Sequence, residues 1–186
     1  FISLAATSSG AFALSQRKMV LRRGITLAIV FTILFSGGMI PSYLVAKELG
    51  ILNSVWAMVL PGAVSAYNLL IFRAFFEGLP EELFDAGRID GLQDLSLFTR
   101  IVVPLSKPVF AAIGLFVAVG IWNNYYNALI YLRDANLFPL QSVLRDLVIT
   151  GSLANEVASR SSMRSETEVV TSLKYATIIV STLPIL

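Results

Sequence analysis

The chain has 186 residues, of which 56% are hydrophobic and only 14% are charged. Soluble domains average about 45–50% apolar and about 25% charged residues. This composition, with a mean hydropathy of +0.76 and a net charge of +2, therefore indicates an all-α integral membrane protein. The chain contains no cysteine and no histidine, which excludes disulfides, iron–sulfur clusters, histidine metal sites and histidine-dependent catalysis. We expect neither a metal site nor a catalytic residue.

Three uncharged stretches are long enough to cross a bilayer, which requires roughly 20 apolar residues. They are residues 24–46, 51–72 and 108–132. A charged side chain at the centre of a spanning helix costs about 2.5–3.5 kcal/mol on insertion scales, and none of the three contains one. The apolar residues 1–16 and 175–186 resemble parts of two further spans. The sequence thus predicts one polytopic transmembrane domain over residues 1–186.

The distribution of basic residues predicts an orientation for these spans. Residues 17–23 carry four positive charges in seven positions, and short loops rich in Lys and Arg stay in the cytoplasm. Alternation of the spans then places the loop 73–107 in the cytoplasm and the segments 47–50 and 133–174 outside.

Two of the predicted spans contain residues that disturb helices. Pro61 and Gly62 lie in the middle of the second stretch, and proline kinks a helix because it removes one backbone hydrogen bond. These two residues are candidates for a gating hinge, although proline is also frequent in membrane helices without such a role. For Gly37, Gly38 and Pro41, close helix packing is the simpler explanation.

The loop 73–107 predicts two short helices joined by a glycine turn. Pro80 fits a first helical position, and the acids after it fall where the helix dipole favours negative charge. Gly91 fits a helix stop, and Asp94 can cap the second helix. The apolar face of the second helix is formed at helical spacing by Leu95, Phe98, Ile101 and Val102. Charge and capping alone explain this hairpin equally well as a solvated connection between two spans.

The spacing within the loop favours a more specific interpretation. Asp85-Ala86-Gly87 is followed after three residues by Gly91, and after nine more by Ile101-x-Val103-Pro104. This pattern resembles the EAA loop of ABC importer permeases, which reads E-A-A, three residues, G, nine residues, I-x-L-P. Every spacing agrees, and the flanking sequences are similar to the carbohydrate-uptake branch. Asp85, Gly87 and Val103 depart from the pattern, and Gly87 weakens the helix by about 1 kcal/mol.

The resemblance implies a permease subunit of an ATP-driven ABC importer that forms half of the path for a di- or oligosaccharide. Permeases of this family cross the bacterial cell membrane six times, and this chain would carry the end of the second span to the start of the sixth. The loop would form a coupling helix that docks on a separate ATPase dimer. The implied coupling residues are Glu82, Asp85, Ala86, Gly87, Asp90, Gly91, Ile101 and Pro104.

The resemblance also implies the partners of the chain. They are the ATPase dimer, a second, homologous permease subunit, an extracytoplasmic solute-binding protein and the lipid bilayer, with no role for nucleic acid. ATP and magnesium would bind to the ATPase, so we expect no cofactor on this chain.

A polar and aromatic stretch in the span 108–132 is a candidate for the substrate path. Asn123 and Asn127 are four residues apart and would share a helix face, as would Trp122 and Tyr126. Amides suit sugar hydroxyl groups and aromatic rings suit apolar sugar faces. Helix–helix hydrogen bonds and an interfacial aromatic belt explain the same residues.

The external segment predicts an amphipathic helix after Pro139. Its apolar positions follow helical spacing at Leu140, Val143, Leu144, Leu147 and Val148. This helix would either lie in the outer interface or meet the solute-binding protein. Residues 151–168 are rich in Ser, Arg and Glu and predict a polar surface.

Two other classes of protein compete with a permease subunit. An intramembrane enzyme without His or Cys needs ionisable groups within the bilayer, and the complete spans contain none. A secondary carrier usually places such a group at the midplane and leaves the long cytoplasmic loop unexplained.

Overall fold

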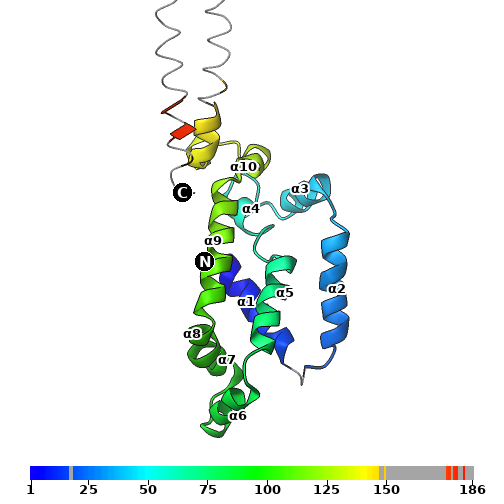
Figure 1. Ribbon diagram of the computed structural model, residues 1–186. Helices are drawn as coiled ribbons and strands as arrows, with labels where there is room; N and C mark the ends of the chain where they lie inside the picture. Colours follow the sequence, from blue (N-terminus) through cyan, green and yellow to red (C-terminus); the bar gives the residue numbers. More distant parts are fainter. Residues whose placement is uncertain (17–18, 147–148, 150–174, 177, 180–181, 183–186) are drawn as a thin grey trace, which may run out of the picture. The chain divides into compact units, whose positions relative to one another are not determined.

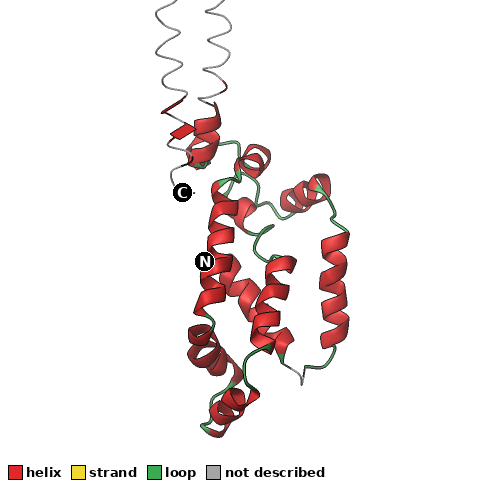
Figure 2. Ribbon diagram, viewed as in Figure 1, coloured by secondary structure: helices red, strands yellow, loops and turns green. Residues whose placement is uncertain are grey.

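The computed structural model describes residues 1–16, 19–146, 149, 175–176, 178–179 and 182. All regular secondary structure in these residues is helical (Figure 2), which confirms the predicted all-α class. The predicted polar surface at residues 151–168 lies outside the described residues, as do most of residues 175–186 and the end of the amphipathic helix predicted over residues 140–148.

The described chain forms two compact units. The first comprises Phe1–Ile51 and Trp56–Ala118, and the second comprises Leu52–Val55 and Val119–Leu186. The first unit begins with five helices (Figure 1): α1 (Ile2–Ser15), α2 (Arg22–Leu34), α3 (Met39–Glu48), α4 (Val55–Val59), which lies mostly in it, and α5 (Ala66–Glu77). The loop that follows contains α6 (Glu81–Ile89), α7 (Asp94–Leu97), the π-helical turn η1 (Phe98–Val102) and α8 (Val103–Leu105). The last helix is α9 (Lys107–Trp122), which also lies mostly in the first unit. The second unit contains α10 (Tyr125–Tyr131), the 3-10 turn η2 (Ala135–Leu137) and helical residues 140–146.

The core of the first unit contains four buried phenylalanines and is centred where α1 packs against α5. Phe12 of α1 meets Phe76 of α5 edge to face, with ring centroids 6.5 Å apart. Phe72, one turn earlier on α5, packs against Phe110 of α9 at 4.7 Å. Burying such a ring contributes about 1.5–3 kcal/mol. Further apolar side chains complete the core, among them Leu14, Leu69, Phe84, Leu97, Val102 and Ile113.

No helix among the described residues is by itself long and apolar enough to cross a membrane. Two bent pairs reach the required length and composition when their members are taken together. These are α2 with α3, bent by 115°, and the segment Asp94–Leu105 with α9, bent by 83°. Each of the three stretches predicted as spans is divided between two helices: 24–46 between α2 and α3, 51–72 between α4 and α5, and 108–132 between α9 and α10.

Helix-breaking residues account for the first two interruptions. Gly38 precedes α3 with φ +80°, a conformation that glycine adopts readily and other residues rarely do. Pro41 follows in the first turn of α3, where its missing N–H costs no helical hydrogen bond. Pro61 and Gly62 lie within the non-helical residues 60–65. The kink predicted there is therefore a complete break.

In the second unit, one asparagine joins two distant segments. Asn53 has φ +56°, which asparagine tolerates better than most residues. Its side-chain Oδ1 accepts the backbone N–H groups of Arg133 at 2.8 Å and Asp134 at 2.9 Å. Its own N–H donates to the carbonyl of Tyr131 at 2.9 Å. Three hydrogen bonds thus hold the turn before α4 against the end of α10.

Candidate functional site

α6 occupies the position of the predicted coupling segment. Pro80, predicted as the first helical residue, takes the N-cap position instead, so the helix begins one residue later, at Glu81. Glu81 and Glu82 lie in its first turn. The helix ends at Ile89, and Gly91 follows with φ +79°. Glycine reverses the chain there without the penalty of a side chain. The structure confirms the acidic first turn and the glycine stop.

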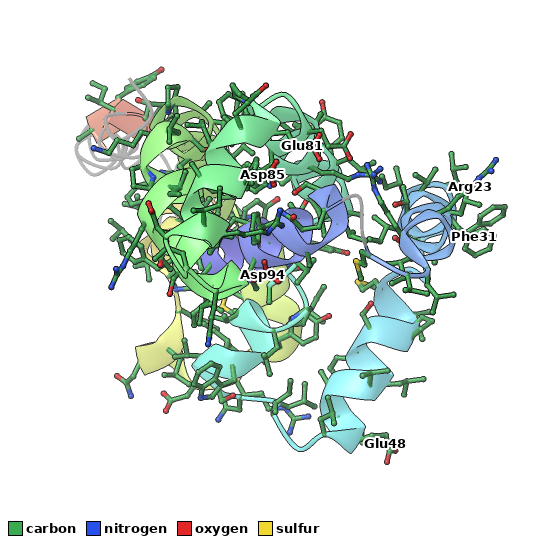
Figure 3. The ribbon with its side chains drawn as sticks, turned by 90° about the horizontal axis from the view of Figure 1, so that it is seen from below. Arg23, Phe31, Glu48, Glu81, Asp85 and Asp94 are labelled. Carbon is green, nitrogen blue, oxygen red and sulfur yellow. The ribbon has the colours of Figure 1, made fainter. Side chains whose placement is uncertain are left out.

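The two faces of α6 differ in burial. Phe84 and Gly87 face the core, where Phe84 stacks on Phe12 with ring centroids 6.4 Å apart. The opposite face is exposed, with Asp85 visible on α6 in the view from below (Figure 3); the Asp85 side chain is 64% exposed. Six of the eight predicted coupling residues are exposed: Glu82, Asp85, Ala86, Asp90, Gly91 and Pro104. A partner protein therefore has access to an acidic surface on α6.

Gly87 allows α6 to pack closely on the segment that follows it. A methyl group at this position would lie 2.9 Å from Cδ1 of Ile101 and closer still to Leu97. Leu97 is fully buried and has little freedom to move away. The sequence analysis treated Gly87 as a weakness of the helix and, by resemblance, as a coupling residue, whereas its position is buried. In the structure, the missing Cβ provides the space that Leu97 and Ile101 fill.

The second helix of the loop differs from its prediction in two ways. Asp94 is the first residue of α7, and Gln93 takes the cap position assigned to Asp94. Leu95, expected on the apolar face, is 74% exposed, whereas Leu97 is fully buried. Leu97 shares the inward side with Phe98, Ile101 and Val102, at helical spacing. The turn Phe98–Val102 is π-helical. Pro104 is exposed in α8.

Arg88, which the sequence analysis did not include among the coupling residues, holds α6 in place through contacts with its neighbours. Its guanidinium donates to Oε1 of Gln16 at 3.0 Å and to Oδ1 of Asp85 at 3.5 Å. It also lies 3.9 Å from a carboxylate oxygen of Asp94. Arg88 thereby ties the end of α6 to α1 and α7. Its place in the last turn of a predicted helix, after an acid three residues earlier, was the available signal.

A second charged cluster joins the start of α2 to the end of α5. The carboxylate of Glu77 pairs with Arg22 and, at 2.6 Å, with Nε of Arg73. Arg73 also donates to the hydroxyl of Thr26. Burial raises the pKa of Glu77, but the hydrogen bonds and charges of Arg73 and Arg22 outweigh it and lower that pKa below its ordinary value. The pairs between α2 and α5 are 47 and 55 residues apart and have no local signal. The i,i+4 spacing of Arg73 and Glu77 was the available signal.

The candidate path residues lie in the second unit and do not share one helix. α9 ends at Trp122, α10 begins at Tyr125, and Asn123 lies in the break between them. The side-chain amide of Asn123 donates to the carbonyl of Val119 at 3.0 Å. The common face predicted for Asn123 and Asn127 is therefore wrong, because the asparagine side chain competes with the helical backbone for hydrogen bonds. Tyr126 is 56% exposed.

Comparison with known proteins places these features in a family context. Residues 9–185 match the model of a family described as "Binding-protein-dependent transport system inner membrane component". The chain is 43% identical to the polygalacturonan/rhamnogalacturonan transport system permease protein YtcP of Bacillus subtilis (strain 168), covering 100% of the chain and 64% of that protein. It is 42% identical to Protein LplC of the same strain, covering 100% and 62% respectively.

A solved structure is also similar. It is the crystal structure of a bacterial ABC transporter involved in the import of the acidic polysaccharide alginate. The TM-score is 0.87 at 32% identity, and the match covers 99% of this chain and 65% of that chain. The likeness confirms the predicted importer-permease fold. The chain spans less than two thirds of the length of each of these three proteins.

Proposed function

Because the chain belongs to the family of binding-protein-dependent transport system inner membrane components, we propose that it forms half of the translocation path of an ATP-driven importer. In this proposal it is a transport subunit and not an enzyme. It crosses the bacterial cell membrane several times, with residues 73–107 in the cytoplasm. The fold it shares with a polysaccharide-importing ABC transporter supports the proposal.

The exposed acidic face of α6 is the observation that carries the coupling role. Asp85 lies at its centre, flanked by Glu82 and Asp90, and would pair with a basic group on the ATPase. The partner binds ATP and magnesium, and this chain holds neither. The contacts of Gly87 and Arg88 support the proposal, because a helix fixed on its inner side can pass a displacement to the core.

The proposed substrate is a di- or oligosaccharide. Two of the similar proteins are named for polygalacturonan/rhamnogalacturonan and for alginate, so oligosaccharides from such polymers are the first substrates to test. Aromatic rings and amides near the α9–α10 break suit sugar faces and hydroxyl groups; the proposed contacts are Trp122, Asn123, Tyr126 and Asn127. Pro61 and Gly62 are proposed as a hinge, which their non-helical position between α4 and α5 permits.

Two further partners complete the proposed importer. A second, homologous permease subunit would form the other half of the path. An extracytoplasmic solute-binding protein would deliver the sugar; the family description, which refers to a binding protein, supports this partner.

The test is co-purification of the ATPase with the full-length permease complex. We expect Asp85→Lys to reduce ATPase retention strongly, because it reverses a charge on the proposed docking face. Glu48→Lys is the matched control, since it reverses an exposed charge at the end of α3, which lies in the predicted external turn. Equal ATPase retention in wild type and both variants would contradict the coupling role of α6.

A further inference from the structure

A basic pocket of about 520 Å³ lies at the start of α2. Three arginines line it, Arg22 and Arg23 from α2 and Arg73 from α5, together with the hydroxyl-bearing Thr26. The rest of the lining is apolar and consists of Met19, Leu21 and Leu27. The pocket therefore combines donors for an anion with apolar walls.

Positive charge is in excess at this pocket. Glu77 is the carboxylate that pairs with Arg22 and Arg73, and one carboxylate cannot neutralise three guanidinium groups. The Arg23 side chain is exposed and makes no ion pair or hydrogen bond with the part of the chain that the structure describes. Guanidinium groups bind phosphate oxygens well because their planar fork matches that geometry.

The helix that leads away from the pocket has an apolar and uncovered surface. No side chain of α2 is buried, and large apolar groups are exposed along it, including Leu27, Phe31 and Leu34. Figure 3 shows Arg23 and Phe31 on the same side of α2, pointing away from the other helices. At 1.5 Å per residue, the helix from Arg23 to Leu34 covers about 16 Å, close to one leaflet of a hydrocarbon core of about 30 Å.

We propose that this pocket binds the phosphate headgroup of an anionic phospholipid, whose acyl chains lie along the apolar surface of α2. The inference rests on the proposed function for one point, which is that the start of α2 meets the cytoplasmic leaflet. The excess positive charge selects an anionic lipid over a zwitterionic one. The adjacent exposed apolar side chains favour a lipid over free phosphate, because free phosphate has no acyl chain that could contact them.

The experiment uses the full-length permease complex, incorporated in nanodiscs of phosphatidylcholine with or without phosphatidylglycerol. Native mass spectrometry after detergent extraction counts the phosphatidylglycerol molecules that each complex retains, and titration of the lipid gives the affinity. Inorganic phosphate is added in a parallel titration as a competitor. The variants are Arg23→Ala, Arg23→Lys and, as a matched control for charge loss, Lys47→Ala at the far end of α3.

We expect the wild type to retain phosphatidylglycerol in preference to phosphatidylcholine. Arg23→Ala should weaken binding about fivefold, since a basic residue near an anionic surface contributes about that factor. Arg23→Lys should lose less, and Lys47→Ala should bind as the wild type does. The proposal is overturned if Arg23→Ala binds as the wild type does, if Lys47→Ala loses as much, or if inorganic phosphate displaces the lipid.

The outcome is separable from that of the proposed function. Asp85→Lys removes the proposed ATPase contact but leaves the pocket intact, so it should keep its phosphatidylglycerol. A complex that retains the lipid but never the ATPase contradicts the importer proposal alone. A complex that retains the ATPase in all variants without preference for phosphatidylglycerol contradicts the lipid site alone.

Discussion

α6 and α2 are both short helices of the first unit, but they relate to the rest of the chain in opposite ways. α6 is rich in charge, yet its apolar residue Phe84 is buried against α1 and its glycine is in close contact with α7. α2 is mostly apolar, yet none of its side chains is buried. Its described contacts with α5 include the charged cluster at its first turns.

The difference shows which surfaces the chain covers by itself. α6 follows the rule for soluble proteins, with apolar residues inward and charges outward. α2 departs from that rule, and exposed apolar surface of this extent marks an interface with lipid or protein. Matched substitutions in the two helices or their neighbours should therefore differ in their effects, most strongly for aromatic residues.

The largest contrast is expected between two phenylalanines. Phe72→Ala should destabilise the protein by about 3–5 kcal/mol, because Phe72 is fully buried and the substitution leaves a cavity. Phe31→Ala should cost only about 0.5–1.5 kcal/mol, since Phe31 is 57% exposed and loses mainly its stacking with Phe35 at 4.4 Å. Thermal unfolding of the full-length complex in detergent measures both. Equal losses would mean that α2 is packed as tightly as α5.

A second contrast concerns glycine. Gly87→Ala gains about 1 kcal/mol of helix propensity but crowds Leu97 and Ile101, which costs about 1–3 kcal/mol. We expect a net loss of stability. Gly87→Ala should cost less in the Leu97→Ala background than in the wild type, because the smaller side chain leaves room for the added methyl group. Gly24→Ala in α2 meets no atom within 4 Å and should only stabilise. Strict additivity of the Gly87 and Leu97 substitutions in a double-mutant cycle would contradict the packing argument.

A smaller contrast concerns arginine. Arg88→Ala should cost about 1 kcal/mol, because it removes a hydrogen bond to Gln16 and two partly exposed ion pairs. Arg23→Ala should leave the unfolding temperature nearly unchanged, as Arg23 has no such partner in the described chain. Both variants are measured in detergent without added anionic lipid. A larger loss for Arg23 than for Arg88 would be inconsistent with these contacts.

The smallest effect is a dependence on pH at Glu77, which lies in the loop that follows the second predicted span. Its folded pKa is lowered from an ordinary value of 4.5. The ion pairs therefore stabilise fully above that ordinary value, and the stabilisation is lost as the pH falls through the lowered folded pKa. Glu77→Gln should be less stable than wild type at neutral pH, and the gap should narrow on acidification. Unfolding temperatures measured across this range test the sign; a gap that widens in acid contradicts it.

The sequence predicted the loop better than the spans. Caps, acidic first turns and glycine stops act over a few residues, so Glu81, Glu82 and Gly91 were recognisable locally. The breaks at Gly38 and Pro61 were visible as residues, but a hydropathy window cannot distinguish a kink from a complete interruption. The break at Asn123 was harder to predict, because an asparagine side chain can bond to a backbone carbonyl with the helix continuing or ending there.

The remaining misses depend on contacts between distant parts of the chain. Leu97 lies on the inward side in the space beside Gly87, and this close approach of two helices has no signal in the sequence. Arg88 reaches Gln16 across 72 residues. The local pattern of one sequence does not show which residues so far apart will be in contact.

The hydrogen bonds of Asn53 have a topological consequence. They join positions 80 and 81 residues apart, so the chain leaves and returns to the same place. The entropy of closing a loop grows only slowly with its length, and three hydrogen bonds within one folded unit suffice to close it. Residues 53–133 thus form a loop that is closed by hydrogen bonds and not by a covalent cross-link. Replacing Asn53 with alanine removes the two hydrogen bonds that the side chain accepts and keeps the backbone bond to Tyr131, so one bond closes the loop in place of three.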